Sequence, residues 1–431
     1  MTKTNLTALS RRRLLQTGAG AGLLTMTGGL FTPALAQERT LKIGYVSPQS
    51  GALALFGEAD GFIVEGIRAA FANGLTVGGK TYPLEIITKD TQSNPNRAAE
   101  VTNELISNDQ VDIVVVAAAP ETVNPVSDQC ELNGTPCIST ISPWQPWIFG
   151  RGSSPDQGFA STFHFFWGFE DIMAVFADMW DSIGAGKAVG GIFPNDEDGR
   201  AWADETTGAP ALLAARGYKV TPSGFYQNLS DDFSAVISTF KDAGCDVITG
   251  APIPPDFTTF WTQARQQGFR PKAATVAKAI LFPAAVEALG DAGHNLSSEV
   301  WWSPSHPFAS SVLGSSAEKL AGDYTAATGK QWTQPIGFVH ALFELATDVL
   351  KRTEEIGNPE AVVAAIAATK LDTVVGPIDF STSGIKNVAK TPLVGGQWRL
   401  REGTANKYDI VITSNKLAPN IPVASEMQAL G

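Results

Sequence analysis

The loop after the first apolar segment carries the first side chains that could bind a ligand. Ser47, Gln49 and Ser50 can offer hydroxyl and amide hydrogen bonds. A β-branched and aromatic run precedes them at residues 41–46, and apolar residues recur at helical spacing over residues 62–71. The pattern predicts a strand, a loop and a helix. Ligands of open α/β sheets bind beyond the carboxyl ends of the strands, so we expect this loop to contact a ligand. The alternative is an ordinary polar connection.

The spacings that usually mark metal and catalytic sites are missing from the sequence. Its four histidines are scattered, and no His-x3-His or Cys-x2-Cys pair occurs. There is no G-x-S-x-G nucleophile elbow and no G-x4-G-K-[ST] phosphate loop. The acidic segment 195–199 does not follow the EF-hand offsets of a calcium loop. We therefore expect a protein that is not an enzyme and that uses no metal or cofactor.

Charge and hydropathy exclude further classes. The chain has 431 residues and a formal net charge of −12 at pH 7. Nucleic-acid binding without sequence preference needs clustered lysines and arginines, so we expect no nucleic-acid partner. After the first 36 residues, no stretch reaches the roughly 18 consecutive apolar residues of a membrane helix.

Residues 1–36 have the features of a twin-arginine export signal. Consecutive arginines at 11–13 precede an apolar segment rich in Gly and Ala, which ends in an A-x-A cleavage pattern at residues 34–36. We expect export to the periplasm with cleavage near Ala36; an uncleaved anchor is the alternative. Cleavage would leave 395 residues with a charge of −16, because the leader carries Lys3, three arginines and no acid. That length suits two lobes rather than one core.

Two of the three cysteines lie close together in the sequence. Cys130 and Cys137 flank an Asn-Gly turn between a predicted helix and a predicted strand, so a disulfide is a possible pairing in an oxidising compartment. The sequence leaves open whether they are bonded. Cys245, inside an apolar run, is interpreted as a small buried residue.

Strand and helix patterns alternate along the rest of the chain. Continuous apolar runs such as residues 111–117 are typical of strands buried on both faces of a parallel sheet. The alternation occurs in two series, which predicts an α/β fold with two lobes, each built on a doubly wound parallel sheet. Predicted strands include 82–90, 111–117, 136–140, 188–193, 218–220, 247–250, 394–400 and 408–412, and predicted helices include 96–108, 123–132, 199–216, 233–243, 257–267, 317–328 and 336–352.

Several short segments, taken in order, resemble the branched-chain amino-acid (Leu/Ile/Val) binding protein family, the periplasmic substrate-binding proteins of ABC transporters. No single segment is specific, but together they extend across nearly the whole mature chain. The segments are Val-Ser-Pro-Gln-Ser-Gly at 46–51, Lys-Asp at 89–90, Asp-Asp-Phe-Ser at 231–234, Ala-Gly-Cys-Asp-Val-Ile at 243–248 and Val-Gly-Pro-Ile-Asp-Phe at 375–380.

The resemblance implies a type I periplasmic binding fold, in which a three-stranded hinge joins the two lobes. Three crossings are then expected near residue 162, at 303–304 and within 376–392. The implied division is an export signal at 1–36, lobe 1 at 37–162 and 304–378, and lobe 2 at 163–303 and 379–431, the last part including the hinge return and the C-terminal tail. A hinge of this kind allows closure around a ligand.

In relatives that bind amino acids, hydroxyl groups of the second and third loops of lobe 1 hold the ligand carboxylate. Here the second loop has Glu121 and Thr122 instead of a serine-rich run. A protein carboxylate beside a ligand carboxylate would be repulsive unless one were protonated or Glu121 pointed away. This departure puts a plain α-amino acid in doubt. The alternative is that Glu121 is an exposed acid at a helix N-terminus.

Aromatic residues are concentrated near the expected cleft. Trp144 lies in a proline-stiffened loop, Phe56 stands where relatives cover the ligand with a ring, and Phe166 and Trp167 lie near a crossing. Such clefts hold apolar or π-bearing bodies, or cations over a ring face; core packing is the alternative. Lys278 could pair with an anionic head group or extend to water. The predicted ligand-binding residues are Ser47, Gln49, Ser50, Phe56, Glu121, Thr122, Thr140, Ser142, Trp144, Asp198, Trp202, Ile253, Pro254, Lys278 and Phe338.

The function implied is that of an extracytoplasmic receptor of an ABC importer. We expect a monomer that closes on a small organic solute, either amino-acid-like, an amide or an aromatic or apolar carboxylate, and delivers it to permease subunits in the inner membrane. One alternative is a ligand-sensing protein that partners a sensor kinase or chemoreceptor. Another is an exported α/β enzyme.

Overall fold

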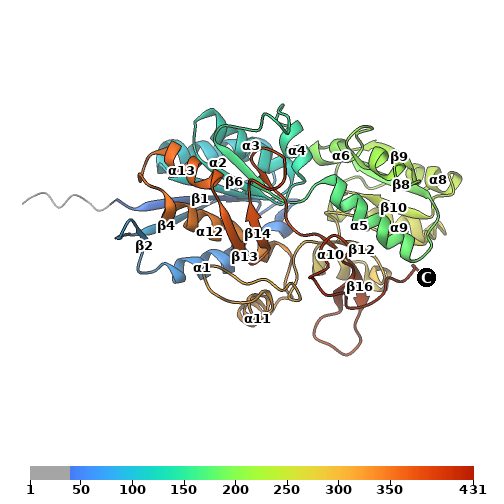
Figure 1. Cartoon of the computed structure of the whole chain (residues 1–431). Coiled ribbons are helices and arrows are strands. Elements are labelled where there is room, and N and C mark those ends of the chain that lie inside the picture. Colours follow the sequence, from blue (N-terminus) through green and yellow to red (C-terminus); the bar gives the residue numbers. More distant parts are fainter. Residues whose placement is uncertain (1–38) are drawn as a thin grey trace, which may run out of the picture. The chain divides into compact units, whose positions relative to one another are not determined.

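The computed structural model describes residues 39–431, and the predicted export signal lies outside these residues. Within this range, no helix combines the length and the apolar character needed to span a membrane. Figure 1 shows an α/β chain in which helices flank central strands. Two parallel sheets organise the chain, and we call the parts built on them lobe 1 and lobe 2.

Lobe 1 is built on a six-stranded, fully parallel sheet. Its strand order is β15-β7-β6-β5-β1-β4. The strand β4 lies on one side of β1, and β5, β6, β7 and β15 follow in order on the other side. The strands are β1 (Leu41–Ser47), β4 (Leu84–Asp90), β5 (Ile113–Ala117), β6 (Cys137–Thr140), β7 (Thr162–Phe165) and β15 (Val388–Ala389).

The side chains of β5 show why helices cover both faces of this sheet. Successive side chains of a strand point to opposite faces, and every residue of β5 is buried. Val115 belongs to the core that includes α1 (Asp60–Ala70) and α12 (Pro335–Arg352). Val114 and Val116 belong to the core that includes α2 (Pro95–Glu104) and α3 (Pro120–Leu132). The unbroken apolar run of β5 therefore matches its place as a central strand covered on both faces.

Lobe 2 repeats this arrangement with a parallel sheet of order β11-β10-β8-β9. Beside it lies an antiparallel sheet of order β12-β16-β17, linked to β11 by a bridge between Thr275 and Ser297. The strands are β8 (Ala188–Pro194), β9 (Lys219–Tyr226), β10 (Val247–Gly250), β11 (Ala273–Ala274), β12 (Ser297–Val300), β16 (Val394–Leu400) and β17 (Tyr408–Ser414); the helices are α5 (Phe169–Ser182), α6 (Glu197–Trp202), α7 (Ala209–Ala214), α8 (Ser234–Asp242), α9 (Pro254–Gln266) and α10 (Pro283–Glu287).

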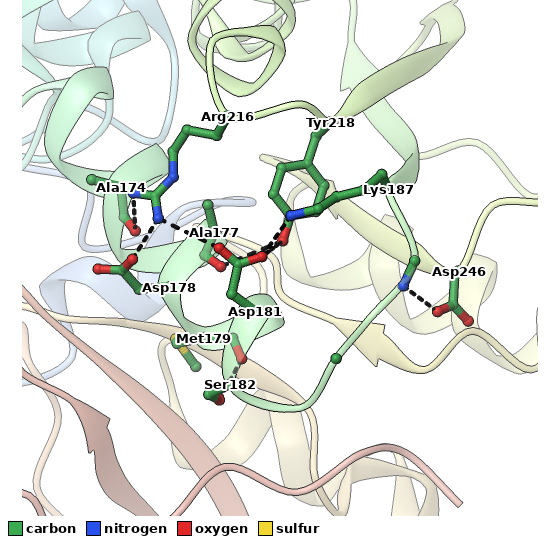
Figure 2. Close-up of polar contacts among 12 residues, drawn as sticks. Ala174, Ala177, Asp178, Met179, Asp181, Ser182, Lys187, Arg216, Tyr218 and Asp246 are labelled. Atoms are coloured by element: carbon green, nitrogen blue, oxygen red, sulfur yellow. Dashed lines mark hydrogen bonds and ion pairs between the residues drawn. The ribbon is translucent and has the colours of Figure 1, made fainter.

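Polar contacts tie α5 to the neighbouring elements of lobe 2 (Figure 2). Asp181 accepts hydrogen bonds from Lys187 Nζ at 2.6 Å and from the Tyr218 hydroxyl at 2.7 Å. Arg216 pairs with Asp178 at 2.5 Å. Because Asp181 and Lys187 are about half exposed, solvent weakens their attraction, so we attribute to this network mainly the orientation of α5.

The chain passes between the two parts at three places. The strand β7 pairs with β6 from Thr162 to Phe165, and Phe166 N–H donates to Ala389 O in lobe 1 at 3.1 Å. The first crossing therefore follows Phe165, close to the position near residue 162 where it was expected, because residues 162–165 complete the first sheet. The other crossings follow β12 and β15.

Two predicted helices differ from the structure. The helix expected over 96–108 ends at Glu104 and continues as a π-turn, η3 (Leu105–Asp109), and the helix expected over 199–216 is divided into α6 and α7. Cys130, Cys137 and Cys245 are all free and buried, so the structure does not contain the possible Cys130–Cys137 disulfide. The remaining elements are η2 (Ala54–Gly57), β2 (Leu75–Val77), β3 (Lys80–Tyr82), α4 (Trp144–Phe149), η4 (Gly290–Gly293), α11 (Ala317–Thr328), α13 (Pro359–Ala367), β13 (Lys370–Thr373) and β14 (Gly376–Asp379).

Candidate functional site

A cavity of about 30 Å³ lies where the loops of the two lobes meet. Lobe 1 contributes residues that follow β1, β5, β6 and β7, and lobe 2 contributes residues that follow β8 and β11 together with part of β12 and its exit. Carboxyl ends of parallel strands share one edge of a sheet, which explains how distant loops line one cavity. The lining residues are Phe56, Ala119, Pro120, Ile141, Pro143, Phe166, Trp167, Asp198, Trp202, Ala277, Lys278, Leu281, Glu299 and Trp301.

Two of the lining residues have an unusual backbone conformation. Ile141 and Lys278 have φ values of 65° and 62°. This left-handed region is costly for residues with a Cβ, and particularly for a β-branched isoleucine. Such strain is concentrated at functional sites, and here one strained residue lies on each side of the cavity.

Lys278 forms the charged centre of the site. Its side chain is 4% exposed, and Nζ lies 2.6 Å from Glu121 Oε1, 3.4 Å from Asp198 Oδ2 and 3.8 Å from Asp196 Oδ2. Glu121 is the second residue of α3 in lobe 1, whereas the other two acids belong to the loop and first turn of α6 in lobe 2. The ion pair between Glu121 and Lys278 therefore joins the two lobes.

Burial and charge act in opposite directions on these groups. Burial works to lower the pKa of Lys278, but the carboxylates of Glu121, Asp196 and Asp198 outweigh it and hold the pKa above its ordinary value. Burial raises the pKa of Glu121, and Lys278 only partly opposes that rise. Burial also raises the pKa of Asp198 to about 6 and that of Glu299 to about 8. The site thus contains more carboxyl groups than its one ammonium group can neutralise.

Aromatic rings form much of the remaining wall. Phe56 of lobe 1 packs edge to face on Phe282 of lobe 2, with 4.9 Å between ring centroids. Phe166 contacts Trp167 at 4.5 Å and Trp301 at 5.5 Å. The fifth lining ring, Trp202, is 1% exposed. An apolar or π-bearing body fits such a wall.

Some of the predicted binding residues line the cavity or contact a lining residue. Phe56, Asp198, Trp202 and Lys278 line it, and Glu121 binds Lys278. Lys278 is thus neither extended into solvent nor free, and Glu121, with 16% of its side chain exposed, is not the exposed helix acid of the alternative.

The other predicted residues do not line the cavity themselves, although Thr122, Ser142 and Phe338 contact residues that do. Ser47 donates to the buried Asp60, and Gln49 and Ser50 bind Asp90. The Trp144 indole N–H donates to Glu170 at 2.9 Å, beside the first crossing. Thr122 donates to Ala119 O, Thr140 to Phe165 O and Ser142 to Pro143 O. Ile253 and Pro254 lie at the start of α9. Phe338 packs against the rings of Phe166 and Trp301.

Sequence reasoning missed Glu299 and Trp301. Both lie at or just after β12, where the chain leaves lobe 2 and where the sequence predicted a hinge crossing. The available signal was the pair of tryptophans at 301 and 302 beside an expected crossing. No group of histidine, cysteine and acidic side chains in residues 39–431 is arranged to hold a metal ion.

Two parallel α/β sheets, three crossings and a cavity between facing loops are the architecture of a two-lobed solute-binding protein. The sequence agrees with this class: residues 40–404 match the model of the periplasmic binding protein family, and the chain belongs to that family. The short segments that resemble the branched-chain amino-acid binding proteins all lie within this matched range.

Among its relatives, an amino acid binding protein of Pseudomonas aeruginosa is 27% identical over 262 residues, which is 60% of this chain and 65% of that protein. The match therefore spans slightly less than two thirds of that relative. A leucine binding protein, LivK, from Thermotoga maritima superposes with a TM-score of 0.69 at 21% identity, covering 86% of this chain and 97% of the other. A solute binding protein of an ABC transporter from Rhodopseudomonas palustris, in complex with 3,4-dihydroxy benzoic acid, gives 0.68 at 17% identity, covering 89% and 99%.

Proposed function

We propose that this protein is the extracytoplasmic solute receptor of an ABC importer, and that it captures one small organic molecule by closure of its two lobes. The main support for this proposal is the cavity, because residues of both lobes line it and because Glu121 of lobe 1 forms an ion pair with Lys278 of lobe 2. A ligand that contacts both lobes favours the closed state by its differential affinity. A hinge with three crossings permits that motion.

We also propose how the protein is exported and which partners it has. The leader would direct export by the twin-arginine system with cleavage near Ala36, and the monomeric receptor would deliver its solute to permease subunits in the inner membrane. N-terminal sequencing of protein recovered from the periplasm tests export and the cleavage site. A mature chain that begins at residue 37 is expected, and a retained leader would contradict it.

Native mass spectrometry tests the binding function. Protein purified without denaturation should carry one small molecule per chain, and unfolding should release it. Native protein that carries and releases no solute, and that does not bind any solute from a periplasmic extract, would overturn the proposed function.

A further inference from the structure

The charge around the cavity is unbalanced in a way that restricts its ligand. Four carboxyl groups, those of Glu121, Asp196, Asp198 and Glu299, are gathered around the Lys278 side chain or the cavity wall beside it. Lys278 is the one cationic residue among those that line the cavity in residues 39–431, and its ammonium group already lies within 4 Å of three carboxylates. Even with Glu299 protonated, since its pKa is raised to about 8, the described residues of the lining include no free cation with which a ligand carboxylate could pair.

Lobe 1 offers little to a ligand carboxylate either. Its lining loops present Ala119, Pro120, Ile141 and Pro143, which have no hydroxyl groups, and the two prolines have no N–H. The N-terminus of α3 would favour an anion, but Glu121 in its first turn already supplies one. The chain thus provides its own carboxylate at this point.

Unpartnered polar atoms in the wall indicate what the ligand must supply. Asp198 is 5% exposed, and its Oδ1 has no hydrogen-bond partner within the described part of the chain. The indole N–H groups of Trp167 and Trp301, which are 3% and 1% exposed, are also without a partner there. A buried polar group without a partner is costly, so the ligand is expected to donate to Asp198 and to accept from an indole.

Aromatic rings form much of the remaining surface of the cavity. Phe56, Phe166, Trp167, Trp202 and Trp301 present aromatic surface to the cavity. The negative face of an aromatic ring attracts a cation, and the same rings hold an apolar body by burial. A buried carboxylate close to aromatic rings is a suitable environment for an ammonium group.

We propose that the cavity selects a small organic cation: an apolar or aromatic body with one ammonium group, a neutral acceptor oxygen and no free carboxylate. The ammonium group binds Asp198 and the ring faces, with Glu299 beside it, and the acceptor oxygen binds an indole N–H. This assignment rests on the proposed solute-binding function and narrows its ligand class. It disfavours both simple amino acids and aromatic acids.

Two matched series of compounds test the assignment. One consists of leucinol, leucine and 4-methylpentanoate, and the other of phenylalaninol, phenylalanine and 3-phenylpropanoate, so that each body is presented as a cation, a zwitterion and an anion. Isothermal titration calorimetry on ligand-stripped protein should show that at least one amino alcohol binds tenfold or more tightly than its amino acid, and that the carboxylates bind more weakly still. Equal or tighter binding by an amino acid or carboxylate, or no binding by either amino alcohol, would overturn the assignment.

A variant identifies the group that carries the selectivity. Asp198→Asn should weaken binding of the preferred amino alcohol at least tenfold and reduce the preference over the amino acid. The control is Asp181→Asn, an acid of the ion-pair network on α5 (Figure 2), which should leave both affinities within twofold. Unchanged affinity in Asp198→Asn would contradict the assignment. Tight binding of a carboxylate would overturn the cation preference but leave the proposed solute-binding function intact. Failure of the solute-binding function would instead appear as native protein that carries and releases no solute.

Discussion

We expect Glu121 and Lys278 to be coupled in the affinity for the solute. Their atoms lie 2.6 Å apart and come from different lobes, so the contact forms as the lobes close and contributes to the free energy of binding. The test is a double-mutant cycle with Glu121→Gln, Lys278→Met and the double variant, measured by calorimetry with the solute recovered from native protein. The cycle isolates the pair, although Lys278 also lines the cavity.

The size of the coupling follows from the burial of the pair. Unit charges about 4 Å apart attract by about 4 kcal/mol at an effective dielectric constant of 20. Desolvation of both groups cancels part of this, since their side chains are only 4% and 16% exposed. We therefore expect a coupling energy of about 1.5–3 kcal/mol, which is roughly a 10- to 150-fold effect on the dissociation constant.

A second ion pair provides the control for this cycle. Lys319 and Asp323 lie 2.7 Å apart on α11, both more than half exposed and within one helix. Closure does not form or break their contact, so their coupling in solute affinity should be below about 0.5 kcal/mol. A Glu121–Lys278 coupling no larger than this would refute the inference that the pair joins the lobes in solution.

Three further predictions follow from individual side chains. Phe56→Ala should weaken solute binding by roughly 30-fold, or about 2 kcal/mol, because a buried ring is lost. Trp144 lies outside the cavity lining, so Trp144→Phe should change the affinity by less than twofold. Equal losses of affinity in calorimetry would contradict the placement of the two rings. Burial raises the pKa of Asp60 from 3.8 to about 7, so the native state binds more protons than the unfolded state between about pH 4 and 7. The free energy of unfolding should therefore fall as the pH rises through that window. The melting temperature of Asp60→Asn should depend less on pH than that of the wild type, and an unchanged dependence would contradict the raised pKa of Asp60. Thiol titration should detect no reactive cysteine in the native protein and three after unfolding, whereas a single thiol in denaturant would reveal a Cys130–Cys137 bond.

The strands were the most predictable part of this fold. Consecutive residues form the apolar run of β5 and the alternating pattern of β16, so both patterns can be seen locally in the sequence. The strand β16 has the predicted limits of 394 and 400. The first crossing was less predictable, because residues 162–165 of β7 pair with strands on both sides, one of which comes more than 200 residues later. Pairing over such a distance leaves no local signal.

The site was predictable at the level of loops and less so at the level of side chains. The loops after β1, β5 and β6 do approach the cavity, as strand order requires. Ser47 and Trp144 instead bind acids on neighbouring helices, Asp60 and Glu170, which sequence spacing does not reveal. Sequence reasoning raised Glu121 as a difficulty for a ligand carboxylate, and the structure gives its partner as Lys278, 157 residues later in the chain.

The motion of the lobes is the central claim, and small-angle X-ray scattering measures it directly. Ligand-stripped protein should contract when the solute recovered from native protein is added, with a radius of gyration that falls and saturates at one solute per chain. An unchanged radius of gyration at saturating solute would contradict closure around a ligand.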